Sequence, residues 1–339
     1  MQGSEPRGRE ETVSEVTNHW KPRIAQDVTE LVGGTPLVQI NRLVSPNTAR
    51  VLGKLESENP GGSVKDRTAL SIVQAAEADG RLQPGGTILE ATSGNTGIAL
   101  AWIGAVKGYR VIIVMPDDVS EERRTLLRAL GAELVLTPGP LAMAGANQEA
   151  GRILEGLPGA FLSGQGGNDA NPAVHERTTG PEIWEATEGE VDIFVATVGT
   201  GGTLTGAGRY LKSRNPDIRV VAVQPAEAPV LSGGEFQPHK IQGIIGGNGF
   251  PPVLDIELAD EIIGIPQDQA IETARESLVR EGLLLGISSG AALAAARELA
   301  ERPENAGKTI VTVLPDTGER YLSTDLFAHV RGGEPEGAE

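Results

Sequence analysis

The feature that most constrains the fold is an alternation of short apolar runs with helix-forming stretches along almost the whole chain. Strands are predicted at residues 51–55, 87–91, 110–115, 133–137, 193–198, 219–224 and 309–314. Helices are predicted at residues 63–80, 94–108, 120–131, 204–213, 268–281 and 290–302. Strands that alternate with helices across short connections form parallel sheets covered by helices on both faces. The pattern therefore predicts an α/β fold.

Composition excludes several classes of function. The formal net charge of −17 argues against nucleic acid and anionic membranes as partners, because both reward a basic patch. The chain has no cysteine, which excludes disulfides, Cys-based zinc sites and a cysteine nucleophile. Residues 1–15 contain no apolar segment of a signal peptide, and the longest apolar run, residues 98–106, is too short to span a bilayer. We expect a cytoplasmic protein without a metal site.

Three glycine-rich turns lie where a predicted strand or apolar segment leads into a predicted helix. They read Ala-Thr-Ser-Gly-Asn-Thr-Gly at residues 91–97, Thr-Val-Gly-Thr-Gly-Gly-Thr at residues 197–203 and Gly-Ile-Ser-Ser-Gly-Ala-Ala at residues 286–292. Open α/β sheets bind ligands at such junctions, where backbone N–H groups and a helix N-terminus favour anions. The first turn suits a carboxylate and the second a phosphate. Each turn taken alone is also compatible with a purely structural role, and the third reads simply as a helix N-cap.

Two further details limit what these segments mean. The second turn lacks the Lys-Ser/Thr of a P-loop, and Leu204 stands where a dinucleotide fingerprint needs its third glycine.

A fourth stretch, residues 59–67, reads Asn-Pro-Gly-Gly-Ser-Val-Lys-Asp-Arg and places Lys65 in the first turns of a helix. A single lysine is usually a surface residue. Lys65 is therefore a candidate for a functional site only because the other motifs occur in the same chain.

Together these segments resemble the cysteine synthase (O-acetylserine sulfhydrylase) branch of the fold-type II pyridoxal-phosphate enzymes, a family that also includes cystathionine β-synthase. The resemblance extends from about residue 32 to residue 324. The segments that carry it are residues 33–37, 59–67, 92–97, 115–116, 120–124, 131–137, 171–172, 175–176, 178–183, 199–203, 239–243 and 286–292. Chance agreement across so many motifs in the same order is negligible.

The resemblance implies a particular architecture. It consists of two doubly wound open sheets of the tryptophan synthase β type, with the active site in the cleft between two domains. Residues 20–58 plus 168–331 would form the larger, cofactor-binding domain, and residues 59–167 the smaller, mobile, substrate-binding domain. Residues 1–19 and 332–339 would be flexible tails.

The resemblance also implies roles for individual residues. Lys65 would hold pyridoxal 5'-phosphate through a Schiff base and later move the α-proton of the substrate. Asn95 would bind the ring oxygen of the cofactor, and Ser288 its pyridine nitrogen. The residues expected to cradle the phosphate are Gly199, Thr200, Gly201, Gly202 and Thr203. Those expected to bind the substrate α-carboxylate are Thr92, Ser93, Gly94, Thr96 and Gln165.

The implied reaction is a β-replacement in which O-acetyl-L-serine and sulfide give L-cysteine and acetate. Closure of the smaller domain would exclude water from the site. Family members are typically homodimers, so a homodimer is expected. The C-terminal tail of serine acetyltransferase is a candidate partner by the same resemblance.

Two segments depart from the family pattern and leave the substrates open. Gly166 and Gly167 follow Gln165, where the sulfhydrylases usually carry an aromatic residue, and residues 243–250 look longer and more polar than usual. Both segments could line the pocket for the substrate side chain or the nucleophile. O-phosphoserine as donor, or a nucleophile other than sulfide, therefore remains an alternative.

Two rival functions also remain. Cystathionine β-synthase, which joins serine and homocysteine, shares the catalytic segments. The absence of cysteine for a haem-ligating pair, and the short stretch after the catalytic region, favour a sulfhydrylase. A degenerate homologue that only docks serine acetyltransferase is disfavoured because Lys65, Asn95, Ser288 and the phosphate turn are intact.

Overall fold

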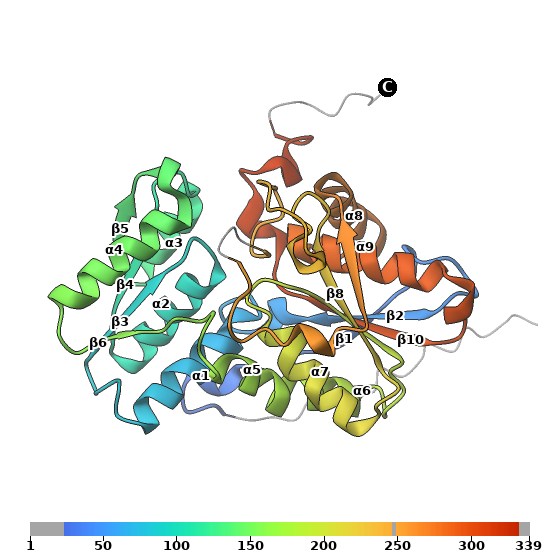
Figure 1. Ribbon diagram of the computed structural model, residues 1–339, viewed down its shortest axis with the longest axis horizontal. Coiled ribbons are helices and arrows are strands. Elements are labelled where there is room, and N and C mark those ends of the chain that lie inside the picture. Colours follow the sequence, from blue (N-terminus) through green and yellow to red (C-terminus); the bar gives the residue numbers. More distant parts are fainter. Residues whose placement is uncertain (1–23, 246–248, 332–339) are drawn as a thin grey trace, which may run out of the picture.

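The computed structural model describes residues 24–245 and 249–331 of the chain. Two β-sheets form separate lobes that lie side by side (Figure 1). The chain first builds two strands of the larger sheet, then the whole smaller sheet, and finally returns to complete the larger one. Each lobe therefore has its own apolar core, and the larger lobe is assembled from the two ends of the described chain.

The larger sheet has six strands and is mixed. In spatial order its strands are β1 (Leu37–Ile40), β2 (Arg50–Leu55), β10 (Thr309–Leu314), β7 (Ile193–Thr197), β8 (Arg219–Pro225) and β9 (Glu261–Ile265). β1 runs antiparallel to β2, and all other neighbours are parallel. Parallel strands need crossover connections, which supply the helices of both faces.

Helices cover both faces of the larger sheet. On one face lie α8 (Gln267–Glu281) and α9 (Ile287–Glu301), and on the other lie α6 (Gly180–Ala186) and α7 (Gly202–Arg214). Strand β7 illustrates the cause. Ile193 and Val195 pack with α8 and α9, whereas Phe194 and Ala196 pack with α6 and α7, because successive strand residues point to opposite faces.

The smaller sheet has four parallel strands. Their spatial order is β5 (Glu133–Thr137), β4 (Arg110–Pro116), β3 (Thr87–Ala91) and β6 (Ala160–Leu162). One face packs on α1 (Lys65–Ala78), α2 (Asn95–Lys107) and α3 (Glu121–Ala129), and the other on α4 (Ala142–Gly156). Thus Ile113 faces α1 and α2, while its neighbours Ile112 and Val114 face α4.

A continuous helical segment lies beneath the larger lobe and contains a π-turn. It consists of α5 (Ala170–Val174), the π-helical turn His175–Thr179 and α6. Such turns are rare and are frequently found at functional sites. The remaining regular elements are short 3₁₀ turns: η1 (Val28–Leu31), η2 (Glu56–Glu58), η3 (Gly139–Leu141), η5 (Val230–Ser232), η6 (Ile256–Leu258), η7 (Pro303–Asn305), η8 (Gly318–Tyr321) and η9 (Asp325–Phe327).

The α/β class with two sheets is confirmed, with one difference: the antiparallel strand β1 makes the larger sheet mixed rather than purely parallel. Each of the predicted strands and helices is present. Strands β1, β6 and β9 and helices α4, α5 and α6 were not predicted. The boundaries of the two domains and the mobility of the smaller one stay predictions, and both predicted tails lie outside the described residues.

Within the described ranges, no helix is both long enough and apolar enough to cross a bilayer.

Candidate active site

The carboxyl ends of β2, β10 and β7 meet at one edge of the larger sheet, and the loops that follow them carry most of the candidate site. Open α/β sheets bind ligands at such an edge. The loops after β2 and β10 are joined directly. Val64 N–H donates to the carbonyl of Pro315 over 2.9 Å, and Ser63 pairs with Asp316 in an isolated bridge. These contacts place the segment before Lys65 against the end of β10.

Lys65 is the first residue of α1, and its side chain is partly buried. Burial lowers the pKa of its amine to about 8 because the charged form loses its hydration, while the carboxylates of Asp316 and Glu90 oppose the shift. An amine with this pKa is partly neutral near neutral pH, and only the neutral amine can attack a carbonyl or accept a proton. Lys65 therefore fits the predicted nucleophile and base.

The second glycine-rich turn follows β7 and leads into α7. A side chain at Gly199 would lie 2.4 Å from the carbonyl of Gly243, and one at Gly202 would overlap the amide of Asn171. Gly201 has a φ of 84°, which glycine adopts without strain. The three glycines therefore let this turn pack closely against Gly243, Leu254 and Asn171 at the N-terminus of α7. Such a cradle fits a phosphate without Lys or Arg.

Two hydroxyls of this cradle are held by neighbouring side chains. Asn171 Nδ2 donates to Thr200 Oγ1 and to the carbonyl of Gln165, each over 2.9 Å, so it connects the cradle to the loop after β6. Thr203 Oγ1 lies 3.3 Å from Nε2 of His175. Burial lowers the pKa of His175 to about 3, so the ring is neutral at physiological pH. Its contacts are those of a structural hydrogen-bonding group.

Ser288 is the second residue of α9 and is 4% exposed. Its hydroxyl has no hydrogen-bond partner among the described residues. A serine in a buried position whose hydroxyl forms no hydrogen bond within the protein is available to a ligand. Ser288 therefore fits the predicted contact to a ring nitrogen.

Asn95 begins α2 and points to the loop after β10. Its Nδ2 donates to Oδ2 of Asp316 over 2.7 Å, and its Oδ1 accepts from Nη1 of Arg320. A primary amide has two N–H donors, so one remains for the cofactor. This contact connects the smaller lobe to the end of β10.

The first glycine-rich turn connects β3 to α2 and carries the predicted carboxylate-binding residues. Thr92 Oγ1 accepts from the N–H of Gly94 over 3.2 Å, and Thr96 Oγ1 donates to Oε1 of Gln165 over 2.8 Å. Ser93 lies between them in the turn, and its carbonyl accepts from Arg123. The N-terminus of α2 faces this turn, which suits an anionic ligand.

Glu90 supports this region from inside the smaller sheet. Its carboxylate is 4% exposed and accepts from the hydroxyl of Ser163 and, over 2.8 Å, from the N–H of Gly164. Burial raises its pKa, and these hydrogen bonds oppose the shift. Glu90 thereby fixes the turn that precedes Gln165.

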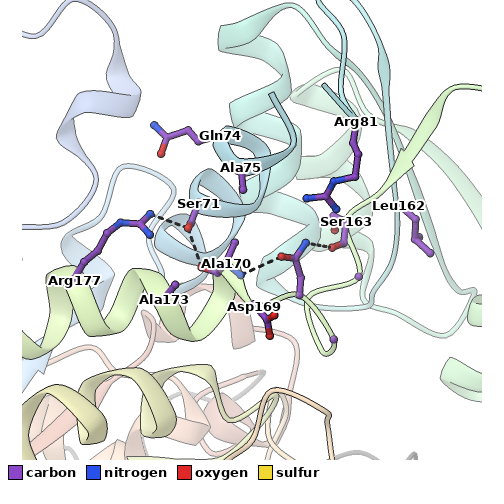
Figure 2. Close-up of a pocket in the computed structure, with 13 residues that line it drawn as sticks. Ser71, Gln74, Ala75, Arg81, Leu162, Ser163, Asp169, Ala170, Ala173 and Arg177 are labelled. Carbon is purple, nitrogen blue, oxygen red and sulfur yellow. Dashed lines mark hydrogen bonds between the residues drawn. The ribbon is translucent and has the colours of Figure 1, made fainter. Parts of the chain in front are cut away.

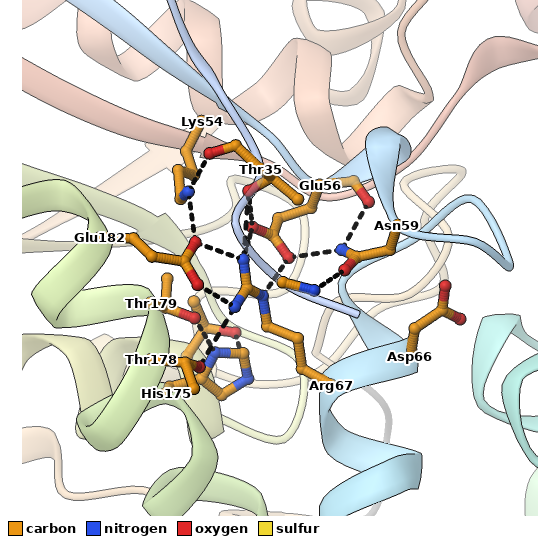
Figure 3. A network of polar contacts seen from close by, with 12 residues as sticks. Thr35, Lys54, Glu56, Asn59, Asp66, Arg67, His175, Thr178, Thr179 and Glu182 are labelled. Carbon is orange, nitrogen blue, oxygen red and sulfur yellow. Dashed lines mark hydrogen bonds and ion pairs between the residues drawn. The ribbon is translucent and has the colours of Figure 1, made fainter. Parts of the chain in front are cut away.

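A buried network of charges surrounds Arg67, which follows Lys65 by two positions in α1 (Figure 3). Arg67 forms two hydrogen bonds to Glu56, of 2.7 and 2.9 Å, and two to Glu182, each of 2.7 Å. Lys54 donates to the same Glu182 over 2.6 Å. The network joins the start of α1 to β2 and α6, so it fixes the helix that carries Lys65.

A pocket of about 840 Å³ lies elsewhere, between α1, α5 and the loop after β6 (Figure 2). None of the predicted site residues lines it. Gly167 does, together with Ser71 and Arg177, which are joined by a 2.8 Å hydrogen bond. The chemistry described above is therefore not located in this pocket.

The two departures from the family pattern are only partly described. A side chain at Gly166 would meet nothing within 4 Å, and one at Gly167 would only touch Pro252 at 4.0 Å. Of the second segment, residues 246–248 lie outside the described residues. Ile245, just before them, donates its N–H to the carbonyl of Val198 over 2.9 Å, next to the phosphate cradle.

Several residues of this region had no predicted role in the site. Asp316 and Arg320 contact Asn95 although they lie more than 220 positions further along the chain, and Tyr321 donates to Asp316; no local pattern reveals these contacts. Glu90 was read as part of an ordinary strand. A buried carboxylate inside a strand, between apolar neighbours, is the signal that could have singled it out.

Comparison with known proteins agrees with this geometry. Residues 28–316 match the model of the pyridoxal-phosphate dependent enzyme family. The cysteine synthase of Staphylococcus aureus is 52% identical over 304 residues, which cover 89% of this chain and 97% of that protein.

Solved structures show the same likeness. The cysteine synthase of Entamoeba histolytica has a TM-score of 0.87 and 44% identity, with 98% of this chain and 96% of that chain covered. An O-ureido-L-serine synthase has a TM-score of 0.88 and 44% identity, with 92% of this chain and 98% of that chain covered. The chain therefore belongs to the pyridoxal-phosphate dependent enzymes, and within them to the cysteine synthase family.

Proposed function

We propose that the protein catalyses β-replacement on O-acetyl-L-serine, in which sulfide displaces acetate and L-cysteine is formed. The observation that carries this proposal is the position of Lys65. An amine with a pKa of about 8 lies at the edge of the sheet that also carries the glycine-rich turn at residues 199–203 and the unpaired hydroxyl of Ser288. The cysteine synthase family supports the choice of substrates.

Pyridoxal phosphate supplies the electron sink that makes loss of the substrate's α-proton feasible. The other steps belong to residues of this chain. Lys65 accepts the α-proton, which allows the bond between Cβ and the acetate oxygen to break. Sulfide then forms a bond to Cβ, and Lys65 returns the proton to Cα. One amine therefore serves as base and as acid in turn.

The remaining residues bind and orient. Residues 199–203 hold the phosphate through backbone N–H groups and hydroxyls, and Asn95 and Ser288 hold the ring. Ser288 is a neutral donor, so it does not enforce a positive charge on a ring nitrogen. A weaker electron sink favours rapid loss of a β-leaving group over a long-lived carbanion.

The turn between β3 and α2 binds the substrate α-carboxylate. Thr92, Ser93 and Thr96 offer hydroxyls there, Gly94 lets the backbone approach, and Gln165 closes the turn through its hydrogen bond with Thr96. Closure of the smaller lobe over this carboxylate would exclude water from the reacting carbon.

A second donor or nucleophile is favoured by one specific observation. The space around Gly166 is open, since an added side chain there would meet nothing within 4 Å. Open space beside Gln165 supports a larger donor such as O-phosphoserine, or a nucleophile larger than sulfide. The likeness to an O-ureido-L-serine synthase supports the same alternative.

A substrate panel tests these proposals. O-acetylserine, O-phosphoserine and serine are each combined with sulfide, thiosulfate and homocysteine, and the amino-acid product is quantified. We expect the highest kcat/KM with O-acetylserine and sulfide, and no turnover by Lys65→Ala. If the highest rate is instead measured with serine and homocysteine, the proposal is wrong and the protein acts as a cystathionine β-synthase.

The non-catalytic alternative has a simpler test. The purified protein should be yellow and should bleach with hydroxylamine. Protein that stays colourless after incubation with pyridoxal phosphate would leave only the role of docking serine acetyltransferase. For the active enzyme, that tail remains a candidate partner, whose binding should inhibit turnover.

A further inference from the structure

The loop after β10 places a buried carboxylate against the amide of Asn95. Asp316 is 1% exposed, and its Oδ2 accepts from Asn95 Nδ2 over 2.7 Å and from the hydroxyl of Tyr321 over 2.6 Å. Arg320 of the same loop donates to Oδ1 of Asn95 and to the carbonyl of Gly61. The amide is therefore held at both ends by one short segment.

The chemistry of these partners allows only one orientation of the amide. A guanidinium can only donate hydrogen bonds, so the group facing Arg320 must be the carbonyl oxygen of Asn95. Asp316 Oδ2, which already receives the Tyr321 hydroxyl, takes the N–H side. Rotating the amide by 180° would place donor against donor and acceptor against acceptor. The second N–H of Asn95 is thereby left to point away from both.

The arrangement is costly as a purely structural feature. The second carboxylate oxygen of Asp316, Oδ1, is buried and forms no hydrogen bond with any described residue. A buried carboxylate with an unmet acceptor costs free energy, which an apolar side chain would avoid. The cost of a carboxylate at position 316 is explained if Asp316 has a function that an apolar residue cannot perform.

We propose that Asp316 and Arg320 are positioning residues that lock the amide of Asn95 with one N–H directed at the cofactor ring. This inference rests on the proposed role of Asn95 as a cofactor contact. Neither residue needs to touch the cofactor itself. The same segment contacts the smaller lobe, since Arg320 reaches the glycine-rich approach to Lys65. Asn95 would therefore be set in place before the cofactor arrives.

The experiment is a double-mutant cycle with cofactor binding as its readout. Asn95→Ala, Asp316→Leu and Arg320→Met are made singly, and each of the last two is combined with Asn95→Ala. Cofactor-free protein is titrated with pyridoxal 5'-phosphate, and the dissociation constant and the absorption maximum of the bound cofactor are recorded. Thermal unfolding of each cofactor-free variant monitors the fold.

We expect each single substitution to weaken cofactor binding about tenfold, as for loss of one hydrogen bond to a ligand group. On the Asn95→Ala background, Arg320→Met should change the dissociation constant less than about twofold, because residues acting through one group are not additive. Asp316→Leu also removes a charge that acts on Lys65, so its effect on the dissociation constant should be smaller there than in the wild-type background, although it should not vanish. All three single variants should displace the absorption maximum in the same direction. These results together would support the proposal.

Two further variants keep the test decisive if Asp316→Leu does not fold. Asp316→Asn retains an acceptor oxygen, so it should bind the cofactor within about threefold of the wild type. The matched control is Asp325→Asn, the same chemical change on an exposed residue nearby that pairs with Lys240. It should leave both the affinity and the spectrum unchanged.

Full additivity of either substitution with Asn95→Ala would overturn the proposal. The same holds if Asp316→Asn is as impaired as Asp316→Leu, because the acceptor would then not be the cause. Unchanged cofactor binding in Asn95→Ala would remove the premise as well. None of these readouts depends on which amino acid the enzyme uses, so they are independent of the substrate panel.

Discussion

At the scale of single residues, burial sets the chemistry of Lys65. The pKa of its amine is about 8, compared with 10.5 for a free lysine side chain. The shift arises because the charged form loses water at the start of α1, and the carboxylates of Asp316 and Glu90 limit it. The neutral form, which reacts with an aldehyde, is therefore populated at much lower pH than in a solvated lysine.

This shift predicts the pH dependence of cofactor uptake. The rate at which cofactor-free protein takes up pyridoxal phosphate should rise with pH through about 8, where half of Lys65 is neutral, and level off about one to two pH units higher. Stopped-flow absorbance measures it, with an N-acetyl-lysine reference that corrects for ionisation of the cofactor. A rate that still rises steeply at pH 10 would show that the amine is solvated.

At the scale of elements, helix α1 depends on the buried charges behind it. Arg67 and Glu56 are 1% and 0% exposed, and burial alone would raise the pKa of Glu56, but the charge of Arg67 holds it below its usual value. A pair of this kind adds little net stability over an apolar pair. Removing one partner, however, leaves the other charge buried without compensation.

Arg67→Met should therefore destabilise the protein by about 3–5 kcal/mol. The double substitution Glu56→Gln with Arg67→Met should recover part of this loss, because the buried residue 56 then carries no charge and Glu182 keeps its ion pair with Lys54. Urea unfolding of the cofactor-free variants measures both values. The control is Arg152→Met, which removes the same charge from the surface ion pair with Glu149 and should cost less than about 1 kcal/mol. The difference between the two variants gives the effect of burial, because the chemical change is the same. An equally small effect at Arg67 would contradict the prediction.

The elements also show how far sequence patterns reach. Strands β3 and β10 were predicted with the bounds they have, because each is an apolar, β-branched run between polar or glycine-rich ends. Strand β6 has only three residues, and β9 includes Glu261 and Gly264, so neither has a recognisable period. Helix α4 contains Gly145 and Gly151 and follows two prolines, which mask its periodicity.

The residues of the candidate site likewise fall into those that the sequence predicted and those that it did not. The glycine-rich turns and Lys65 were predictable because each is a contiguous motif with its own chemistry. The partners of Asn95 were not, because the hydrogen bond to Asp316 joins residues 221 positions apart. Only the fold brings the loop after β10 to the start of α2. The orientation of an amide is a property of that tertiary contact.

At the scale of the whole molecule, several apolar side chains of the larger lobe remain exposed. Leu278 and Val279 of α8 are 38% and 78% exposed, and Leu322 and Val330 near the end of the described chain are 51% and 61% exposed. Exposed apolar side chains are available to an interface with a second copy of the chain. They support the homodimer expected from the family resemblance, which stays a prediction.

Light scattering after size exclusion tests this prediction. The measured mass should be twice the 35.4 kDa of one chain. Val279→Asp should shift the mass toward that of one chain if α8 contributes to the interface, whereas Glu155→Lys on α4 in the smaller lobe should not. A wild-type mass of one chain at micromolar concentration would contradict the homodimer.

The place of β2 in the larger sheet has a consequence for synthesis of the protein. β2 pairs with β1 on one side and with β10 on the other, and β10 comes roughly 250 residues later in the chain. On a ribosome adding about 5–20 residues per second, the second edge of β2 stays open for about 13–50 seconds. An open apolar edge of this kind can pair with other nascent chains. The enzyme should therefore depend on chaperones during translation more strongly than its mature stability suggests.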